Sequence, residues 1–474
     1  MTVDLRSHLR WHGALRHRNF RLFFGGQLIS LVGTWMQSLA QSWLILILTH
    51  DPFWLGIVAA FQFLPVLLIG LFGGMVADVL PKRKTVIATQ TASMLLAFVL
   101  AFLSWAQLVQ VWHILVLAAL LGVVNAIDMP TRQAFTVEMV GREDVTNAVG
   151  LGSASFNAAR IVGPAIGGIL IGLLGVTLCF FLNGVSFIAV IIGLLLMRDE
   201  DLQAVERLAR PEGVRDVIDN LAEGLRYVRA TPVVLLAVVV VGVSSTFALN
   251  FNVVAPAYAQ NVLDVGATGL GFLMAAMGVG ALMSALVVAS FKEPRPGIII
   301  AGAFGLGVLE VVLGGIRSYP LALVAMWGAG LSAIAMMISA NTSIQLATPD
   351  RLRGRVMSVY TTVFAGSTPI GAPVVGWLAS TYGTDIALVA GGLVAVLTAL
   401  AALVWVRRDG LPVVAVAAVR RELARERAAT GVGPGAGVGP GSGVGPGAGV
   451  GPGAAIAPAG SISGGGSPRG SSGS

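Results

Sequence analysis

Residues Gly150 to Gly168 read GLGSASFNAARIVGPAIGG and lie inside an apolar run that continues to about Leu174. The residues that would weaken or bend a helix here include Gly150, Gly163, Pro164, Gly167 and Gly168. In water such a helix would be weak, because glycine costs roughly 1 kcal/mol against alanine and an interior proline about 3 kcal/mol. In a bilayer the backbone must stay helical, and small residues let neighbouring helices approach closely. The stretch therefore predicts a membrane-spanning helix that bends and packs tightly.

The spacing of these glycines recurs in the second half of the chain. Three glycines reappear at the same separations, Gly163, Gly168 and Gly175 as Gly371, Gly376 and Gly383. We therefore expect two related halves.

Composition predicts the same class of protein. Hydrophobic residues make up 56% of the 474 residues and charged residues 11%, whereas a typical soluble domain has about 25% charged residues. The apolar runs cover 20–48, 53–76, 86–106, 111–128, 147–173, 175–197, 232–260, 266–290, 297–317, 320–345, 356–381 and 383–406. Each run is long enough for one span of roughly 20 residues. We expect an all-α membrane protein with twelve transmembrane helices in two pseudo-symmetric six-helix halves, 20–197 and 232–406.

The distribution of positive charge predicts the orientation. If residues 1–19 start on the cytoplasmic side, every Lys and Arg except Arg160 and Arg317 falls in a cytoplasmic segment. Cytoplasmic loops of membrane proteins carry this excess of Lys and Arg. Both termini are expected in the cytoplasm. The net charge of +7 is then explained by topology, and no nucleic acid partner is expected.

Two polar segments lie outside the spans. In the linker 198–231, apolar residues recur at helical spacing between Val214 and Val228. We expect an amphipathic helix on the inner membrane surface, in contact with lipid phosphates; a plain soluble connector is the alternative. The tail 407–474 contains a Gly/Pro-rich repeat from Gly431, a composition typical of disorder.

The loop after the second span carries the first family motif. Residues 74–84 read GMVADVLPKRK, which resembles the inner-loop signature of the major facilitator superfamily. Asp78 matches the aspartate and Lys82 and Arg83 match the basic pair, although Val79 replaces a usual basic residue. The resemblance implies that Asp78 faces the eleventh span and holds the halves together in the outward-facing state. A carboxylate is favoured at a helix N-terminus. A basic turn that only fixes topology is the alternative.

The fifth span resembles the antiporter signature of the same superfamily, with Ala159 in place of one glycine. In relatives this signature accompanies export, so the direction of transport is implied by resemblance alone. Packing against a span of the opposite half would make Gly163 and Gly167 sensitive to added bulk. Small-residue packing without functional meaning is the alternative.

Further segments narrow the resemblance to the branch with enterobactin-type siderophore exporters and macrolide-type efflux proteins. They are DMPTRQAF at 128–135, NA at 147–148, RIVGP at 160–164, EGLRYV at 223–228 and LRGRVM at 352–357. This branch implies a bacterial cytoplasmic membrane protein. The chain departs from proton-coupled drug exporters in lacking an arginine inside the fourth span.

Ionisable residues inside spans are costly and mark functional candidates. Arg160 could balance an anionic substrate or pair with backbone carbonyls near Pro164. Glu310 could carry a coupling proton or sit near the outer interface. Asp128 closes the fourth span within reach of Lys82 or Arg83 and is expected to act in gating, as is Arg355.

Uncharged polar groups inside the spans suit an amphipathic organic molecule. The candidates for substrate contact are Gln37, Gln41, Asn250, Asn341 and Gln345. Some of these could instead form hydrogen bonds between helices.

Together these features predict a monomeric secondary transporter that exports a small amphipathic organic compound by alternating access. Protons are the expected coupling ion. A scaffold or sensor that has lost transport is the alternative. No phosphate-binding loop, nucleophile–base pair or metal-ligand spacing occurs in the sequence, so neither an enzyme nor a cofactor is expected.

Overall fold

The structure, a computed structural model, describes residues 13–203, 214–291 and 296–408; within them, the side chains of 71–79 and 214–217 also lie outside the description. The long apolar runs of the sequence form helices, and every regular element of the described residues is helical. The helices are α1 (Arg18–Thr49), α2 (Phe53–Val79), α3 (Lys82–Trp105), α4 (Val111–Leu174), α5 (Val176–Leu195), α6 (Val214–Ala230), α7 (Pro232–Phe247), α8 (Phe251–Asn261), α9 (Gly266–Ala289), α10 (Pro296–Gly315), α11 (Tyr319–Ala347), α12 (Asp350–Tyr382) and α13 (Thr384–Arg408). Two short 3-10 helices are η1 (Ala14–Arg16) and η2 (Asp199–Asp201).

Eleven helical segments of the described chain are long and apolar enough to cross a membrane. One of them, α4, consists of two arms that meet at Gly141, where φ is 74° and the backbone leaves the helical region. The two arms correspond to the fourth and fifth expected spans, which gives twelve crossings. The apolar run predicted that the fourth span ends at residue 128. The first arm instead continues to Gly141, because the more polar residues that follow 128 are also helical.

The seventh crossing is broken. Helix α7 ends at Phe247 and α8 begins at Phe251, with Asn250 in a non-helical conformation between them. The two pieces together cover Pro232–Asn261, close to the single span expected from the sequence.

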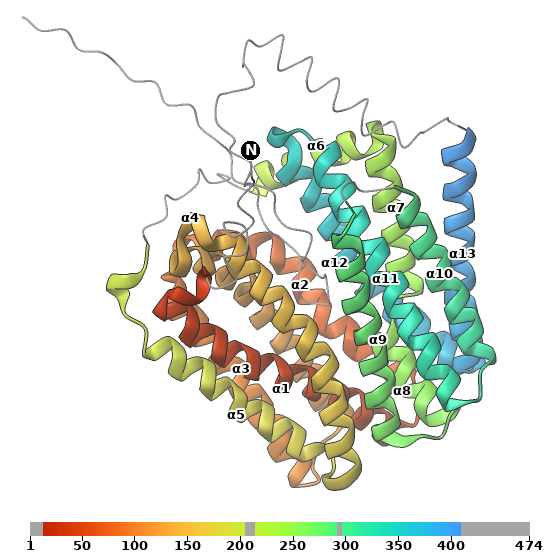
Figure 1. The fold of residues 1–474 in the computed structure, drawn as a ribbon. Helices are drawn as coiled ribbons and strands as arrows, with labels where there is room; N and C mark the ends of the chain where they lie inside the picture. The colour runs from red at the N-terminus through yellow and green to blue at the C-terminus, as the bar shows by residue number, and fades with distance from the viewer. Residues whose placement is uncertain (1–12, 204–213, 292–295, 409–474) are drawn as a thin grey trace, which may run out of the picture.

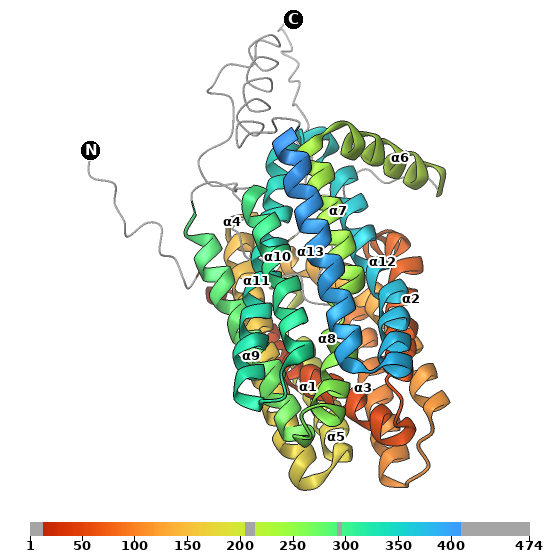
Figure 2. The ribbon, with the colours of Figure 1, turned by 90° about the vertical axis from the view of Figure 1, so that its right-hand side faces the viewer.

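The helices form two bundles (Figure 1). Helices α1 to α5 make up one bundle and α7 to α13 the other. The second arm of α4 packs on α9, and α2 packs on α12, across the boundary. Figure 2 shows α2 beside α12 and α6 lying across one end of the second bundle. We call this end, which also carries the Gly141 kink and the end of α13, the α6 end.

Candidate functional site

The two halves meet at glycines where α4 crosses α9. A Cβ atom added to Gly168 would lie 2.9 Å from Cα of Gly271 and 2.7 Å from the carbonyl oxygen of Ala267. The hydroxyl of Thr268 donates a hydrogen bond of 3.1 Å to the carbonyl of Gly168. The two backbones therefore touch directly, as small residues allow in membrane helices.

A second close crossing joins α2 to α12. A Cβ added to Gly56 would overlap the carbonyl of Ala372, and one added to Gly376 would lie 3.0 Å from the carbonyl oxygen of Pro52. These residues lie at the end of the molecule remote from α6. In Figure 1 the ribbons of the two halves converge at this end and diverge toward the α6 end.

On the α6 side of the α4–α9 crossing, part of the surface of the second arm of α4 is not covered by other residues. Added Cβ atoms at Gly150 and Gly152 would meet no heavy atom within 4 Å. Both glycines are exposed. The halves are thus in close contact at the two crossings, whereas Gly150 and Gly152 are not covered by any other described residue.

A cleft lies between the halves beside the α4–α9 crossing. Four helices line it, with Trp35, Ser38, Leu39 and Ser42 from α1, Pro164 from α4, Phe251, Asn252 and Pro256 from α8, and Leu270 and Met274 from α9. Its aromatic and apolar walls with a few hydroxyl and amide groups suit an amphipathic organic molecule. The cavity between these walls has a volume of only about 10 Å³, far below the roughly 300–1,000 Å³ of drug-sized pockets, so binding requires the halves to separate further.

Asp128 has partners other than the expected ones. Its carboxylate lies 2.9 Å from Nη2 of Arg132 and accepts hydrogen bonds from Thr89 (2.6 Å) and Gln90 (3.0 Å). Lys82 and Arg83, the partners expected from the sequence, pair with Glu138 and Asp199 instead of Asp128. Asp128 therefore ties α3 to α4 inside one half in this conformation.

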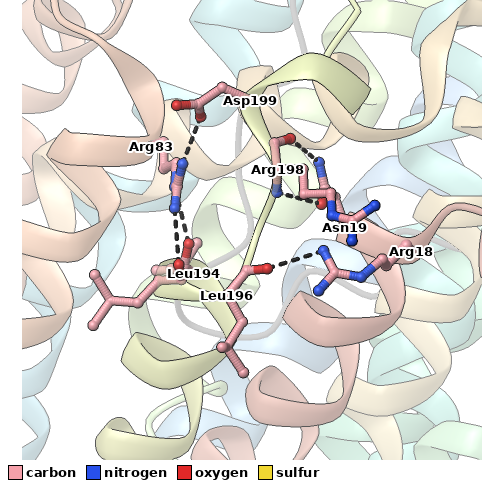
Figure 3. Close-up of polar contacts among 8 residues, drawn as sticks. Arg18, Asn19, Arg83, Leu194, Leu196, Arg198 and Asp199 are labelled. Atoms are coloured by element: carbon pink, nitrogen blue, oxygen red, sulfur yellow. Dashed lines mark hydrogen bonds and ion pairs between the residues drawn. The ribbon is translucent and has the colours of Figure 1, made fainter.

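The basic pair at the start of α3 is also engaged within its own half. Lys82 Nζ lies 2.5 Å from Oε1 of Glu138. Arg83 lies 2.5 Å from Asp199 and donates to the carbonyls of Leu194 and Leu195 at the end of α5 (Figure 3). Cations are favoured at helix C-termini, where carbonyls lack helical partners. The backbone of Asp78 belongs to α2, but its side chain lies outside the described residues, so its expected latch stays a prediction.

The segment after α5 is also held by α1. Arg18 donates to the carbonyl of Leu196 at 2.9 Å, and Asn19 exchanges hydrogen bonds of 2.8 and 3.1 Å with the backbone of Arg198 (Figure 3). The first residues of the linker are thus fixed to the first half.

The last linker helix belongs to the second half. Arg355 of α12 forms an ion pair with Glu223 of α6, and Tyr227 donates a hydrogen bond of 2.7 Å to the carbonyl of Ala347. Burial raises the pKa of the Tyr227 hydroxyl, so it stays a neutral donor at physiological pH. Arg355, which was expected to act in gating, therefore pairs with α6 of its own half. The lipid contacts expected for the linker stay a prediction.

The glycines of the fifth span face two different neighbours. An added Cβ at Gly163 would lie 2.5 Å from Cβ of Trp35, and one at Gly167 would lie 3.0 Å from Cγ of Met36. Both contacts are with α1 of the same half. Gly168 and Gly172 instead face α9 of the opposite half, as does Pro164, whose carbonyl is covered by Gly271. The expected inter-half contact therefore belongs to Gly168 and not to Gly163 or Gly167.

Two buried charged side chains stand out. Arg160 in the second arm of α4 is 6% exposed, and its Nε and Nη2 have no hydrogen-bond partner. Glu310 in α10 is 3% exposed, and its Oε2 has no partner. A Cβ added to Gly391 of α13 would lie 3.4 Å from this Oε2 and 2.6 Å from the carbonyl oxygen of Phe247. Glu310 thus lies beside the break between α7 and α8.

The uncharged candidates mostly serve packing. Gln37 accepts a hydrogen bond of 2.7 Å from Asn183 and joins α1 to α5, and Gln41, one turn on, is half-buried. Asn250 caps the carbonyl of Thr246 at 2.7 Å. Gln345 donates to Asn341 one turn earlier in α11. None of these five candidates lines the cleft. Asn252, a polar group in the same predicted span as Asn250, does line it, together with Ser38 and Ser42, which the sequence did not single out.

The chain matches the family described as "Transmembrane secretion effector" over residues 11–422. It is a member of the major facilitator superfamily. Among characterised relatives, the "Multidrug efflux pump Tap" of Mycolicibacterium fortuitum is 30% identical over 361 residues, 74% of this chain and 87% of that protein. The "Enterobactin exporter EntS" of Escherichia coli O127:H6 is 25% identical and covers 76% of this chain and 85% of that protein.

Solved major facilitator structures share the fold. A POT family transporter in complex with 5-aminolevulinic acid has a TM-score of 0.68 at 12% identity, covering 82% of this chain and 96% of that one. A bacterial homolog of the lysosomal transporter Spinster, in an inward-facing conformation, has a TM-score of 0.63 at 14% identity, covering 85% and 97%. This transporter is therefore a multi-pass membrane protein of the efflux-related major facilitators and not an enzyme.

Proposed function

We propose that this major facilitator is a monomeric, ion-gradient-driven exporter of small amphipathic organic compounds that works by alternating access. The observation that carries the proposal is the asymmetry of the boundary between the halves. Glycine crossings close one end, a small amphipathic cleft lies beside them, and the fifth-span helix is uncovered toward the α6 end. A boundary closed at one end is what one state of an alternating-access transporter requires.

The α6 end faces the cytoplasm in this proposal, and the conformation is the inward-facing one. The excess of Lys and Arg at this end supports the assignment, because positive residues are retained on the cytoplasmic side. Both termini then lie in the cytoplasm, and the membrane is the bacterial inner membrane, as the bacterial relatives suggest.

Glu310 is our candidate for the coupling proton. An isolated ionised carboxylate is expensive to bury, and intramembrane carboxyl groups recur in the proton relays of transporters. Glu310 borders the α7–α8 break through Gly391 and Phe247. Helix α8 follows the break and lines the cleft through Phe251, Asn252 and Pro256. A proton gained or lost at Glu310 can therefore shift α8 and change the cleft.

The names of the relatives suggest where to look for the substrate. Tap is called a multidrug efflux pump and EntS an enterobactin exporter, so drugs and siderophores are the first two classes to test. The competing proposal, a scaffold or sensor without transport, predicts no flux of any compound.

Everted membrane vesicles from cells that express the chain test the proposal with a panel of siderophores and drugs. Export from the cell becomes accumulation in these vesicles. At least one compound should accumulate above the level in vesicles without the protein, and Gly168→Leu should abolish the excess. Equal levels for the whole panel would favour the scaffold or sensor.

A further inference from the structure

Arg160 is a buried cation without a counter-charge. Among the residues that the structure describes, no carboxylate lies within 4.0 Å of its guanidinium, although Arg132, Lys82 and Arg355 all have such partners. Arginine stays protonated in proteins. A buried charge without a partner is costly, so one that persists is a candidate for function.

The backbone carbonyls near Pro164 do not compensate this charge. Pro164 has no N–H, so the helix leaves the carbonyl of Arg160 without its usual partner. This freed group is an acceptor on the backbone of Arg160 itself, and Gly278 of α9 packs beside it. The guanidinium nitrogens Nε and Nη2 bond to no carbonyl. Of the two roles that the sequence left open, pairing with carbonyls is therefore not the one seen.

Arg160 lies next to the cleft. Pro164, one helical turn along the same face of α4, lines the cleft. One turn in the other direction, the ring of Phe156 packs edge-on against Trp35 with centroids 5.6 Å apart, and Trp35 also lines the cleft. Because helical side chains tilt toward the helix N-terminus, we expect the Arg160 side chain to extend from its position between Phe156 and Pro164 toward the α6 side of the cleft. This is the side from which a substrate enters in the inward-facing state.

We propose that Arg160 binds an anionic group of the transported compound, so that the preferred substrates are amphipathic organic anions with a carboxylate or a similar group. This inference rests on the proposed export function and names its substrate class. A guanidinium binds a planar carboxylate through two parallel hydrogen bonds. The aromatic body of the same compound would then lie against Trp35 and Phe251 in the cleft.

Binding of three matched probes to the purified full-length protein in detergent tests the inference. Naphthylacetate, naphthylacetamide and naphthylethylamine share an aromatic body and carry a negative, a neutral and a positive group. Isothermal titration should give a dissociation constant for the anion about tenfold or more below that of the amide, because hydrogen bonds to charged groups are the stronger ones. Equal constants, or no binding of the anion, would overturn the proposal.

Three variants assign the preference to its residue. Arg160→Gln should reduce the anion-to-amide ratio to about one, while Arg160→Lys should keep part of it because the charge remains. Arg317→Gln, a cation at the surface that pairs with Asp385, is the matched control and should keep the full ratio. An anion preference that survives in Arg160→Gln would contradict the assignment.

A stability measurement separates binding from a structural role. Arg160→Gln removes an uncompensated buried charge, so the thermal midpoint of the probe-free protein should stay equal or rise, and naphthylacetate should no longer raise it. A lower midpoint without probe would mean that Arg160 holds the helices together.

Uptake of naphthylacetate into everted vesicles distinguishes this inference from the function on which it rests. Binding of naphthylacetate, with no uptake of it or of any compound in the panel of siderophores and drugs, would refute export and leave the anion site standing. If neutral and cationic compounds are taken up, and Arg160→Gln does not change their uptake, export would stand and the anion site would be refuted.

Discussion

Gly168 of α4 and Gly271 of α9 face each other across the boundary of the two halves, so closely that a methyl group on either would lie 2.9 Å from the α-carbon of the other. Real Cβ atoms do not approach that closely, so any side chain at either position must push the helices apart. In the proposed cycle, this contact forms only while this end of the molecule is closed. Its disruption should therefore act on the conformational equilibrium.

Gly168→Leu should shift the protein toward the state that is open at the end remote from α6. Overpacking costs about 1 to 3 kcal/mol, and this changes a two-state population by about 5- to 150-fold. Single cysteines placed on the two sides of the cleft, in a Cys179→Ala background, report the shift through their labelling rates. Gly315→Leu is the matched control, since a side chain there meets open space and α10 packs on α11 and α13 of its own half. Equal labelling in Gly168→Leu and its parent would mean that the crossing is not part of the cycle.

Gly163→Leu should behave differently from Gly168→Leu. Its added side chain would meet Cβ of Trp35 and the carbonyl of Val32 within α1 of the same half, where no conformational change relieves the overlap. We expect a lower thermal midpoint and less folded protein, without a selective change in labelling on one side. Ala159→Gly, which restores the family pattern, should be tolerated in transport. A well-folded Gly163→Leu variant with shifted labelling would show that α1 also moves against α4.

Asp78→Asn should impair transport while insertion and expression stay close to those of the parent. In the proposed cycle its charge is used in the outward-facing state, where it faces the start of α12, and not in holding the spans in the bilayer. Transport in everted vesicles and the amount of protein in the membrane measure the two effects. Lys82→Gln, which breaks the pair with Glu138 inside one half, serves as a comparison. Export at the normal rate by Asp78→Asn would refute the latch.

Glu310→Gln should separate substrate exchange from the proton gradient. The amide keeps the size of the side chain but cannot gain or lose a proton, so the variant should still exchange labelled for unlabelled substrate. Accumulation driven by an imposed pH difference should be lost. Proteoliposomes measure both quantities. Normal gradient-driven accumulation in Glu310→Gln would show that a residue other than Glu310 carries the coupling proton.

The sequence predicted the membrane fold because apolar runs and the placement of Lys and Arg are direct physical requirements of a bilayer. It missed the continuation of α4 from 128 to the kink at Gly141, because a polar segment outside the bilayer can be helical without any apolar signal. It also missed the break after Phe247, since the residues there, including Asn250 and Asn252, contain neither glycine nor proline and gave no signal that the predicted span 232–260 is interrupted.

The site was predicted less completely. Arg160 and Glu310 could be found because charges in apolar runs are rare. The partners Glu138, Asp199 and Glu223 could not be found, because ion pairs between residues far apart in the chain depend on how helices pack. The sequence also could not show which face of the fifth span contacts which half. Gly167 and Gly168 are adjacent and identical in type, but Gly167 packs on α1 of its own half and Gly168 on α9 of the other.

The central claim is that a gradient drives export, and flux in reconstituted protein tests it most directly. Purified transporter in proteoliposomes, without ATP, receives an imposed pH difference and a labelled compound identified in the vesicle panel. We predict accumulation above the external concentration that collapses when an ionophore dissipates the gradient. Equal flux with and without the gradient, or no flux at all, would contradict the account.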